Sequence, residues 1–539
     1  MADLATTVEV MPVGKPLHTG RSFQPSSRKS IAFFLMALAA AVGYIGFHVA
    51  RDLRTVTLTS GWPYVLLALA LLIALGFEFV NGFHDTANAV AAVIYTHSLE
   101  PNIAVVWSGF CNLAGVLASS GTVAFAVITL LPVELILQVS SGAGFAMVFA
   151  LLLAAILWNL GTWWFGLPAS STHTMVGSIM GVGIANQLIG IHAGASGVDW
   201  QQAFKVLEAL LISPLVGFGF AALLMLLSRR LLKSPTLYTA PKGNQPPPLP
   251  IRALMVLTCT GVSFFHGSND GQKGMGLIML ILIGTVPTAY ALNHTVSAHD
   301  MQAFITASAQ ASHILDQHVS PSAVAVADPR ATVTEYIRAK QLKPDTVPAL
   351  RALVEQVDRE VTQYKAFKSL PDADQANVRN DMYLASEAIA LMQKSHNPPF
   401  DATESAALTN YKSMVDKAIK FIPNWVKVAV ALALGLGTMV GWKRIVVTVG
   451  EKIGKEHLTY AQGAAAGLVT MGTVCAANFW GMPVSTTHTL SSGVAGSMVA
   501  NGNGLRLATV RNIAAGWVFT LPAAALLSGF LFFLFRVIG

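Results

Sequence analysis

The stretch "GMPVSTTHT", Gly481 to Thr489, places a proline and a run of hydroxyl side chains inside an apolar part of the chain. A nearly identical stretch, "GLPASSTHT", occupies Gly166 to Thr174. Proline favours the first turn of a helix, and Ser or Thr at that point accepts hydrogen bonds from the free N–H groups. Each stretch therefore predicts a helix that begins after a break, and the apolar surroundings place the break inside a membrane.

Most of the chain consists of apolar segments of about 20 residues, the length that a helix needs to cross a bilayer. Charged residues make up 11% of the sequence, against about 25% in an ordinary soluble domain. We count about ten to twelve such segments, of which Tyr64–Val80 and Ile513–Phe535 are examples. The sequence therefore predicts an all-α polytopic membrane protein in a lipid bilayer, with no nucleic-acid partner.

Polar segments divide the chain into parts. Residues 1–60 predict an N-terminal extension with one extra membrane helix, at Ser30–Ala50, and no cleavable signal. Residues 229–252 carry Lys and Arg but no acid, which predicts a cytoplasmic linker. Residues 293–422 predict a hydrophilic helical insert. Its 13 Lys/Arg and 15 Asp/Glu nearly cancel, so its charge leaves its side of the membrane open.

Two motifs occur twice, in the same order. Asp85 in "HDTANA" matches Asp270 in "SNDGQKG" at an offset of 185 residues, and Ser170 matches Ser485 at an offset of 315. The two offsets differ by 130 residues, which is close to the length of the insert. Removing the insert therefore brings both pairs of motifs into one register, as a duplicated sequence requires.

We accordingly predict two homologous membrane repeats, at residues 64–228 and 251–539, with the insert interrupting the second. If each repeat crosses the membrane an odd number of times, the two lie inverted relative to each other, as in many secondary transporters. Broken or re-entrant helices at the Ser/Thr stretches complete the expected architecture.

The Ser/Thr stretches are candidates for an anion site. Free N–H groups at a helix start carry partial positive charge, and neighbouring hydroxyls add further donors. Two such helix starts that face each other would bind one tetrahedral oxyanion at the interface between the repeats. The candidate residues are Ser170, Ser171, Thr172, Ser485, Thr486 and Thr487.

Two other interpretations of these stretches are open. The hydroxyls can serve only as helix caps. Alternatively, Ser170 with His173, or Ser485 with His488, can form a nucleophilic pair, which we disfavour because no third group orients the histidine. His173 and His488 have no predicted role beyond support of the helix starts.

Asp85 and Asp270 are carboxylates flanked by apolar spans, where an unpaired charge is costly, so they are candidate functional residues. We assign the coupling ion or proton to a set around them: His84, Asp85, Asn269, Asp270 and Lys273. The structural alternatives are a packed His84 and a Lys273 that reaches the membrane surface. Glu78 lies in the same apolar surroundings and serves either helix packing or a proton path.

These motifs resemble the duplicated Asn-Asp-x-x-Asn signature of the inorganic phosphate transporter (Pit) family, in its bacterial branch. The resemblance runs from about Tyr64 to the end of the chain and includes both Ser/Thr stretches and the insert. It implies an inverted repeat with hairpins, a homodimer, and a site for phosphate and its coupling ion. That site comprises Asp85, Asn88 and Asp270 together with the Ser/Thr stretches.

This sequence departs from the signature at two positions. His84 replaces the first Asn in one copy and Lys273 replaces the last Asn in the other. Sodium prefers neutral or anionic oxygen ligands, so these replacements favour proton coupling over sodium coupling. No residue is assigned to a metal, although the bacterial branch is linked to transport of neutral metal–phosphate complexes.

The expected function is secondary active transport of inorganic phosphate across the bacterial inner membrane. We expect proton-coupled symport by alternating access, with no cofactor and no enzymatic activity. The alternatives are a sodium-coupled phosphate transporter, a permease for sulfate or another oxyanion, and a passive anion channel. A metal–phosphate complex as cargo stays open.

Overall fold

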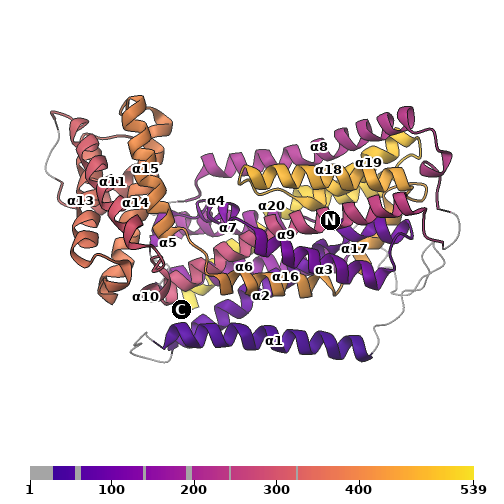
Figure 1. The fold of residues 1–539 in the computed structure, drawn as a ribbon, viewed down its shortest axis with the longest axis horizontal. Helices are drawn as coiled ribbons and strands as arrows, with labels where there is room; N and C mark the ends of the chain where they lie inside the picture. Colours follow the sequence, from indigo (N-terminus) through magenta and orange to yellow (C-terminus); the bar gives the residue numbers. More distant parts are fainter. Residues whose placement is uncertain are drawn as a thin grey trace.

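The computed structural model describes residues 28–54, 62–137, 141–189, 197–241, 245–322 and 326–538. Helices carry nearly all the regular structure of these residues, and the one β-bridge among them joins Gly454 to Leu505 (Figure 1). The first 27 residues of the predicted N-terminal extension and Lys242 of the predicted linker lie outside the described residues. The all-α prediction is confirmed.

Seven of the described helices are long and apolar enough to cross a membrane. They are α1 (Arg28–Leu53), α2 (Trp62–Tyr95), α3 (Pro101–Ala118), α6 (Gly142–Trp164), α8 (Trp200–Leu231), α9 (Leu249–Thr285) and α20 (Leu507–Ile538). The number rises to eight if α15 (Ala402–Ile419) and α16 (Asn424–Thr438), which are bent by 68°, count as one span. This confirms a polytopic membrane protein, with fewer full spans than the expected ten to twelve segments.

The difference arises because several apolar segments form helices that are short or rich in Gly, Ser and Thr. The membrane-associated ones include α7 (Ser171–Ile189), α18 (Tyr460–Phe479) and α19 (Thr486–Asn501). Short elements complete the connections: α4 (Thr122–Ile128), α5 (Val133–Leu137), η2 (Pro235–Leu237), α10 (Pro287–Tyr290), α17 (Lys443–Val447) and a π-helical turn, η4 (Thr448–Lys452).

The long helices run between two ends of the molecule. At the end that we call the linker end, α8 finishes and α9 begins, and Arg252 Nε donates to Ser98 O (2.9 Å) just beyond the end of α2. At the opposite insert end, α9 finishes and α16 begins, and Lys427 Nζ donates to Ser119 O (3.1 Å) beyond the end of α3. Figure 1 shows the insert end on the left and the linker end on the right.

One hairpin, formed by α6 and α7, comes from the insert end. The end of α6 reaches the middle of α2, where Thr162 contacts His84. The chain then turns at Gly166, whose φ of 66° suits glycine, and α7 returns until Gly183 packs against Val198, just before α8.

The second hairpin, formed by α18 and α19, comes from the linker end. The end of α18 reaches the middle of α9, where the side chains of Asn478 and Asn269 are hydrogen-bonded. After a turn at Gly481 (φ 65°), α19 returns to the linker end, where Arg229 donates to Asn501 O. The two hairpins thus approach from opposite ends. This is the arrangement expected of inverted repeats, and the repeat relation itself stays a prediction.

Five helices occupy the predicted insert and lie beyond the ends of the membrane helices (Figure 1). They are α11 (Ala298–Gln317), α12 (Pro329–Ala339), α13 (Thr346–Tyr364), α14 (Asp372–Ser395) and α15, with a short η3 (Phe367–Ser369). The apolar face of α13 is buried between its neighbours. The two ends of the insert meet, because Asn293 N donates to Ala418 O (2.8 Å).

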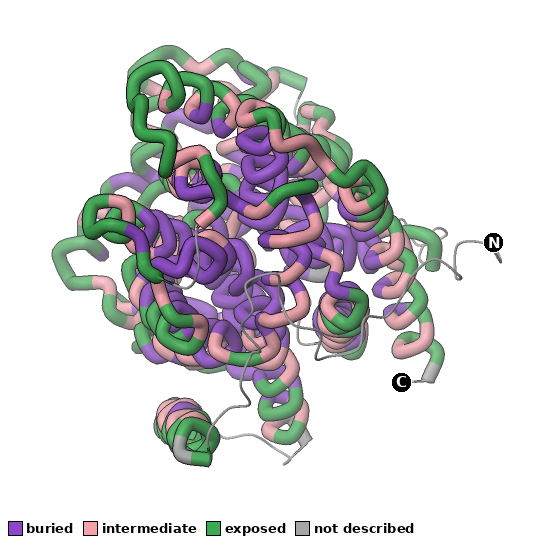
Figure 2. Tube along the Cα trace, turned by 90° about the vertical axis from the view of Figure 1, so that its right-hand side faces the viewer, coloured by how far each residue is buried: buried purple, intermediate pink, exposed green. Residues whose placement is uncertain are grey.

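The buried residues gather in the middle of the helix bundle, as Figure 2 shows. α1 packs less closely against the bundle than the other long helices, because only 6% of the residues in its most apolar 18-residue stretch are buried. It contacts the other described helices mainly near its end, where Tyr290 Oη donates to Asp52 Oδ2 (2.6 Å) and the His48 ring stacks on Trp425.

α3 and α9 pack with their backbones in contact. A Cβ atom added to Gly115 would lie 1.9 Å from Phe264 O, and one added to Gly267 would lie 2.2 Å from Asn112 O. Small residues allow such close helix packing in membranes. The contact fixes the position of Asn112 on α3 relative to α9, and this matters for the site described below.

The opposite placement of insert and linker yields a prediction about topology. The basic linker is expected in the cytoplasm, so the insert is expected on the outer face. A membrane-impermeant maleimide applied to intact cells should label Gln310→Cys in the insert and leave Lys233→Cys in the linker unlabelled. Both variants carry Cys475→Ser, because Cys475 is exposed in the structure, whereas Cys111 and Cys259 are buried.

Permeabilised cells provide the control, since both engineered cysteines should then react. Labelling of the linker but not the insert in intact cells would contradict the predicted orientation.

Candidate functional site

The first serine of each Ser/Thr stretch caps a helix. Ser170 Oγ accepts a hydrogen bond from His173 N (3.2 Å) at the start of α7. Ser485 Oγ accepts one from His488 N (3.1 Å) at the start of α19. Both helices therefore begin at the broken tips of the hairpins, as the sequence predicted. Ser170 and Ser485 use their hydroxyls within their own stretches.

Asp85 on α2 connects the two hairpin tips. Ser171 Oγ donates to its Oδ2 (3.0 Å), and Thr487 Oγ1 donates to its Oδ1 (2.6 Å). Asn88, one turn further along α2, donates to Asp85 Oδ1 (3.3 Å) and to Thr487 Oγ1 (2.8 Å). One hydroxyl from each hairpin thus points at the same carboxylate.

Lys273 forms the corresponding contact on α9. Its ammonium group lies 2.7 Å from Asp270 Oδ1 and also donates to Thr172 Oγ1 of the first hairpin. Thr172 in turn donates to Val484 O (3.1 Å) of the second hairpin. With an exposed fraction of 2%, Lys273 lies in the interior of the bundle and not at its surface.

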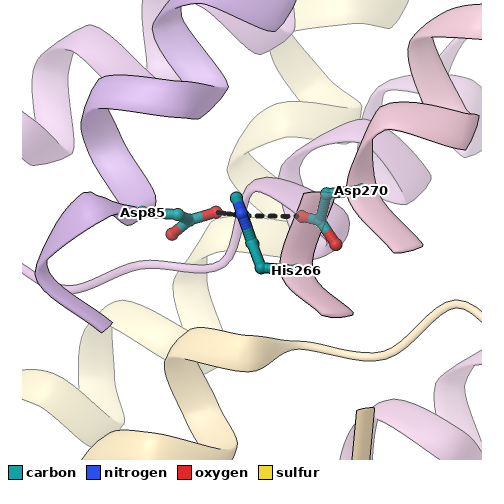
Figure 3. A group of neighbouring side chains, drawn as sticks. All are labelled: Asp85, His266 and Asp270. Atoms are coloured by element: carbon teal, nitrogen blue, oxygen red, sulfur yellow. Dashed lines mark ion pairs between the residues drawn. The ribbon is translucent and has the colours of Figure 1, made fainter. Parts of the chain in front are cut away.

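His266 completes the site and was not among the residues predicted from the sequence. Its Nε2 lies 3.6 Å from Asp85 Oδ2 and 3.6 Å from Asp270 Oδ2, so the ring stands between the two carboxylates (Figure 3). The three side chains offer ligand atoms within 4.8 Å of one another, a group that can hold a metal ion. The repeat offset of 185 aligns His266 with Asn81, and this signal could have drawn attention to it.

The hydrogen bonds behind His266 fix which nitrogen carries a proton. Thr438 Oγ1 donates to Leu434 O and accepts from Asn112 Nδ2 (3.1 Å), which orients the amide of Asn112. Asn112 Oδ1 is then the acceptor facing His266 Nδ1 (2.8 Å), so Nδ1 carries the hydrogen. Nε2 therefore presents either a lone pair or a second proton to Asp85 and Asp270.

The remaining predicted residues support the tips. His84 contacts Thr162 of α6 through Nε2 (3.1 Å) and Asp85 through Nδ1 (3.4 Å). Asn269 donates to Met482 O (3.1 Å) and so holds the second hairpin, without a direct contact to either Asp85 or Asp270. Thr486 Oγ1 accepts a hydrogen bond from Asn88 Nδ2 (3.4 Å).

The two histidines without a predicted role lie against each other where the tips of the hairpins meet. The ring centroids of His173 and His488 are 4.4 Å apart, and His488 stacks on Trp517 of α20 at 4.2 Å. Trp517 Nε1 donates a hydrogen bond to Pro168 O (2.9 Å), which ties α20 to the tip of the first hairpin. This stack joins both hairpins to α20.

The site is closed on all sides in this structure. None of its predicted residues is more than 4% exposed, and His266 is 3% exposed. Hydroxyls, an ammonium group and two carboxylates are thus buried together where the two hairpins meet α2 and α9. Such a cluster can bind a small anion together with a cation, because it contains groups of both charges.

The hydroxyl contacts to Asp85 lead to a stability prediction. A hydrogen bond to a buried carboxylate contributes about 1.5–3 kcal/mol, so Thr487→Val should lower the free energy of unfolding in detergent by roughly that amount. Thr473→Val is the matched control, because the Thr473 hydroxyl bonds only within its own helix, to Val469 O.

A double-mutant cycle with Asp85→Asn separates this contact from general packing. Thr487→Val should have a markedly smaller effect in the Asp85→Asn background. An equal effect in both backgrounds would contradict the assigned contact.

Comparison with known proteins identifies the family of the chain. Residues 81–528 match the phosphate transporter family. The chain is 40% identical to the low-affinity inorganic phosphate transporter PitB of Escherichia coli K12 and 42% identical to PitA of the same strain. Each alignment covers 87% of this chain and 96% of the relative. A solved structure described as "The sodium-dependent phosphate transporter" aligns with 88% of this chain at 20% identity and a TM-score of 0.47.

The family match spans more than half of the chain and contains α9, both hairpins and the later part of α2, including Asp85. The relatives are named as transporters and not as enzymes. The chain belongs to the phosphate transporter family.

Proposed function

We propose that this protein is a secondary active transporter that moves inorganic phosphate across the bacterial inner membrane in symport with protons. Membership of the phosphate transporter family and the helices long enough to span a membrane support the transport of phosphate. The single observation that carries the site is the meeting of two helix starts, one from each hairpin, at Asp85.

The donors at this meeting point suit a phosphate ion. Ser171 and Thr487 now donate to the carboxylate of Asp85, and Lys273 donates to Asp270 and Thr172. Carboxylate and phosphate oxygens accept the same hydrogen bonds. An entering phosphate would therefore take over donors that contact Asp85 and Asp270 in this structure, assisted by Asn88 and Thr486.

A phosphate that joins the two carboxylates needs a compensating positive charge. Asp85 and Asp270 already face each other across His266, and Lys273 supplies one fixed cation. Phosphate entering alone would add negative charge to a buried site, which is costly. A cation that enters with the phosphate removes this cost, and this requirement supports symport over a passive channel.

Protons fit the site better than sodium. Sodium needs several oxygen ligands. The groups nearest the two carboxylates are instead the imidazole nitrogens of His84 and His266 and the ammonium group of Lys273. Proton coupling also favours phosphate over sulfate, because phosphate itself changes its charge by taking up a proton near neutral pH.

The closed site supports alternating access. Its residues are buried, and the two hairpins that form it come from opposite ends of the bundle. Movement of one hairpin would open the site to one side while the other stays closed, as expected for inverted repeats. A homodimer, implied by the family resemblance, is part of the same proposal and is tested by measuring the mass of the purified protein in detergent.

A second candidate cargo, a neutral complex of phosphate with a divalent metal, is favoured by His266. Because Nδ1 donates to Asn112, Nε2 is available to a metal ion together with oxygens of Asp85 and Asp270. Mixed imidazole and carboxylate ligands suit ions such as Zn²⁺ and Mn²⁺. The metal would here be part of the substrate, beside the hydroxyls that hold the phosphate.

The coupling role of Asp270 predicts a transport phenotype. Asp270→Asn leaves Lys273 without its carboxylate partner, so phosphate uptake into proteoliposomes should no longer respond to an inward proton gradient. Uptake of labelled phosphate with and without the gradient measures this, and replacing the proton gradient with a sodium gradient tests the sodium-coupled alternative. Gradient-driven uptake that persists in Asp270→Asn would refute this role of Asp270.

The choice of anion is tested separately. Inhibition of phosphate uptake by excess sulfate would favour a permease for a broader range of oxyanions.

The metal–phosphate candidate makes a separate prediction. His266→Gln should reduce uptake of labelled zinc in the presence of phosphate by about tenfold, the equivalent of about 1.4 kcal/mol of lost metal binding. The matched control is His457→Gln, which alters a histidine at the linker end. If zinc uptake is independent of phosphate in the unmodified protein, the complex is not the cargo.

A further inference from the structure

Glu78 is a buried acid that the site described above does not use. It lies on α2, about two helical turns before Asp85, and none of its surface is exposed. Neither carboxylate oxygen makes a hydrogen bond of ordinary geometry among the described residues, and its nearest polar neighbours are the side chain of Asn81 and the backbone of Gly274. An ionised carboxylate without a partner is far more costly to bury than a neutral carboxyl group, so this geometry fits a Glu78 that carries a proton.

Comparison with the matching position in the other predicted repeat indicates that Glu78 does more than fill space between helices. The offset of 185 that aligns Asp85 with Asp270 aligns Glu78 with Ser263. The Ser263 hydroxyl is satisfied by Ser108 Oγ (2.8 Å) and by Cys259 O (2.7 Å). A small hydroxyl thus completes the packing at this position in one repeat, whereas the other repeat holds a larger acid that makes no hydrogen bond of ordinary geometry among the described residues.

The charged groups that act on Glu78 both come from α9. They are Asp270 and Lys273, the ion pair of the site. The carboxyl group lies directly against Gly274, where an added Cβ would come within 2.3 Å of Oε1. Glycine at this position leaves the room that Glu78 occupies. The parts of α6 and α16 that pack beside this turn of α2 contribute no charged side chain.

Buried polar atoms without partners occur on both α2 and α6 close to the level of Glu78. The two helices are in contact where Gly76 faces Ile156 and again where His84 contacts Thr162. Asn81 and Asn159 lie between these two contacts, and Asn81 Oδ1 and both amide atoms of Asn159 are buried without partners in the described residues. Such atoms are the usual partners of buried water, which conducts protons.

We propose that Glu78 binds the coupling proton, received by way of the unpartnered polar atoms of Asn81 and Asn159, and that its ionisation changes the contacts of Lys273. This inference rests on the proposed proton symport and names the group that carries the proton. Asp85 and Asp270 are engaged by hydroxyls and by Lys273, whereas Glu78 makes no hydrogen bond of ordinary geometry to a described residue.

The coupling follows from the charges. A protonated Glu78 is neutral and leaves Lys273 with Asp270 and Thr172. Loss of the proton places a new negative charge beside α9, which attracts the Lys273 ammonium away from these partners. Thr172 belongs to the first hairpin, so the protonation state of Glu78 reaches the element that must move. Because α2 runs from the insert end towards Asp85, the proton meets Glu78 before it reaches the phosphate site.

The test compares two transport modes of Glu78→Gln in proteoliposomes, with the membrane potential clamped at zero. A gradient of about one pH unit supports a roughly tenfold accumulation of phosphate per coupled proton. Glu78→Gln, which mimics the neutral acid, should lose this accumulation while exchange of labelled for unlabelled phosphate across the membrane persists. Glu208→Gln, which removes an exposed acid from α8, should retain both modes.

An infrared spectrum of the purified protein gives a readout independent of transport. The band of a buried protonated carboxyl group should be present in the unmodified protein and in Glu208→Gln, and should be absent or reduced in Glu78→Gln. An unchanged band would overturn the inference, as would normal gradient-driven accumulation by Glu78→Gln. Loss of exchange as well as accumulation in a folded variant would place Glu78 in the cargo path and would also overturn it.

Failure of the proposed symport looks different. In that case the unmodified protein itself would exchange phosphate without responding to the proton gradient, whatever residue stands at position 78.

Discussion

The structure depends on the contact of two broken helices with one carboxylate. A helix that starts inside a membrane exposes N–H groups that lipid cannot satisfy, so each start must be capped and must face a polar partner. Ser170 and Ser485 provide the caps, while Ser171 and Thr487 provide the contact to Asp85. The hairpins, the close packing of α3 on α9 and the stack around Trp517 all keep these two starts together.

The two halves of the site are alike in plan and different in chemistry. Asp85 in the first half receives neutral hydroxyls and an amide, whereas Asp270 in the second half receives the ammonium of Lys273. The polar residue one turn before each aspartate also differs, with Asn81 in one half and His266 in the other. The two aspartates therefore lie in surroundings of different charge, although the sequence motifs that contain them are alike.

The sequence predicted what depends on local preference and repetition. Pro, Gly and Ser in "GLPASSTHT" and "GMPVSTTHT" predicted where α7 and α19 begin, and glycine with positive φ stands at both turns. Segment length alone could not distinguish a full span from one arm of a hairpin, since both are apolar. The expected ten to twelve segments therefore exceed the seven full spans found among the described helices.

Contacts between distant elements were beyond the reach of sequence patterns. The contact of Lys273 with Thr172 joins residues 101 positions apart, and the orientation of His266 is set by Asn112 and Thr438 on two other helices. Neither Asn112 nor Thr438 stands in a recognisable motif. Their role emerges only when α3, α9 and α16 pack together, because side-chain partners in a helical bundle depend on the rotation of each helix about its axis.

The meeting of the two ends of the insert bears on how such a protein can vary. Asn293 and Ala418 are hydrogen-bonded neighbours, so the chain leaves the membrane bundle and returns to it at nearly one point. An attached domain whose ends are adjacent can be lengthened, shortened or exchanged without changing the distance between the helices on either side. Selection on the insert can thus proceed almost independently of selection on the membrane helices. The surface of the insert is free to diverge while the distance from α9 to α16 is preserved.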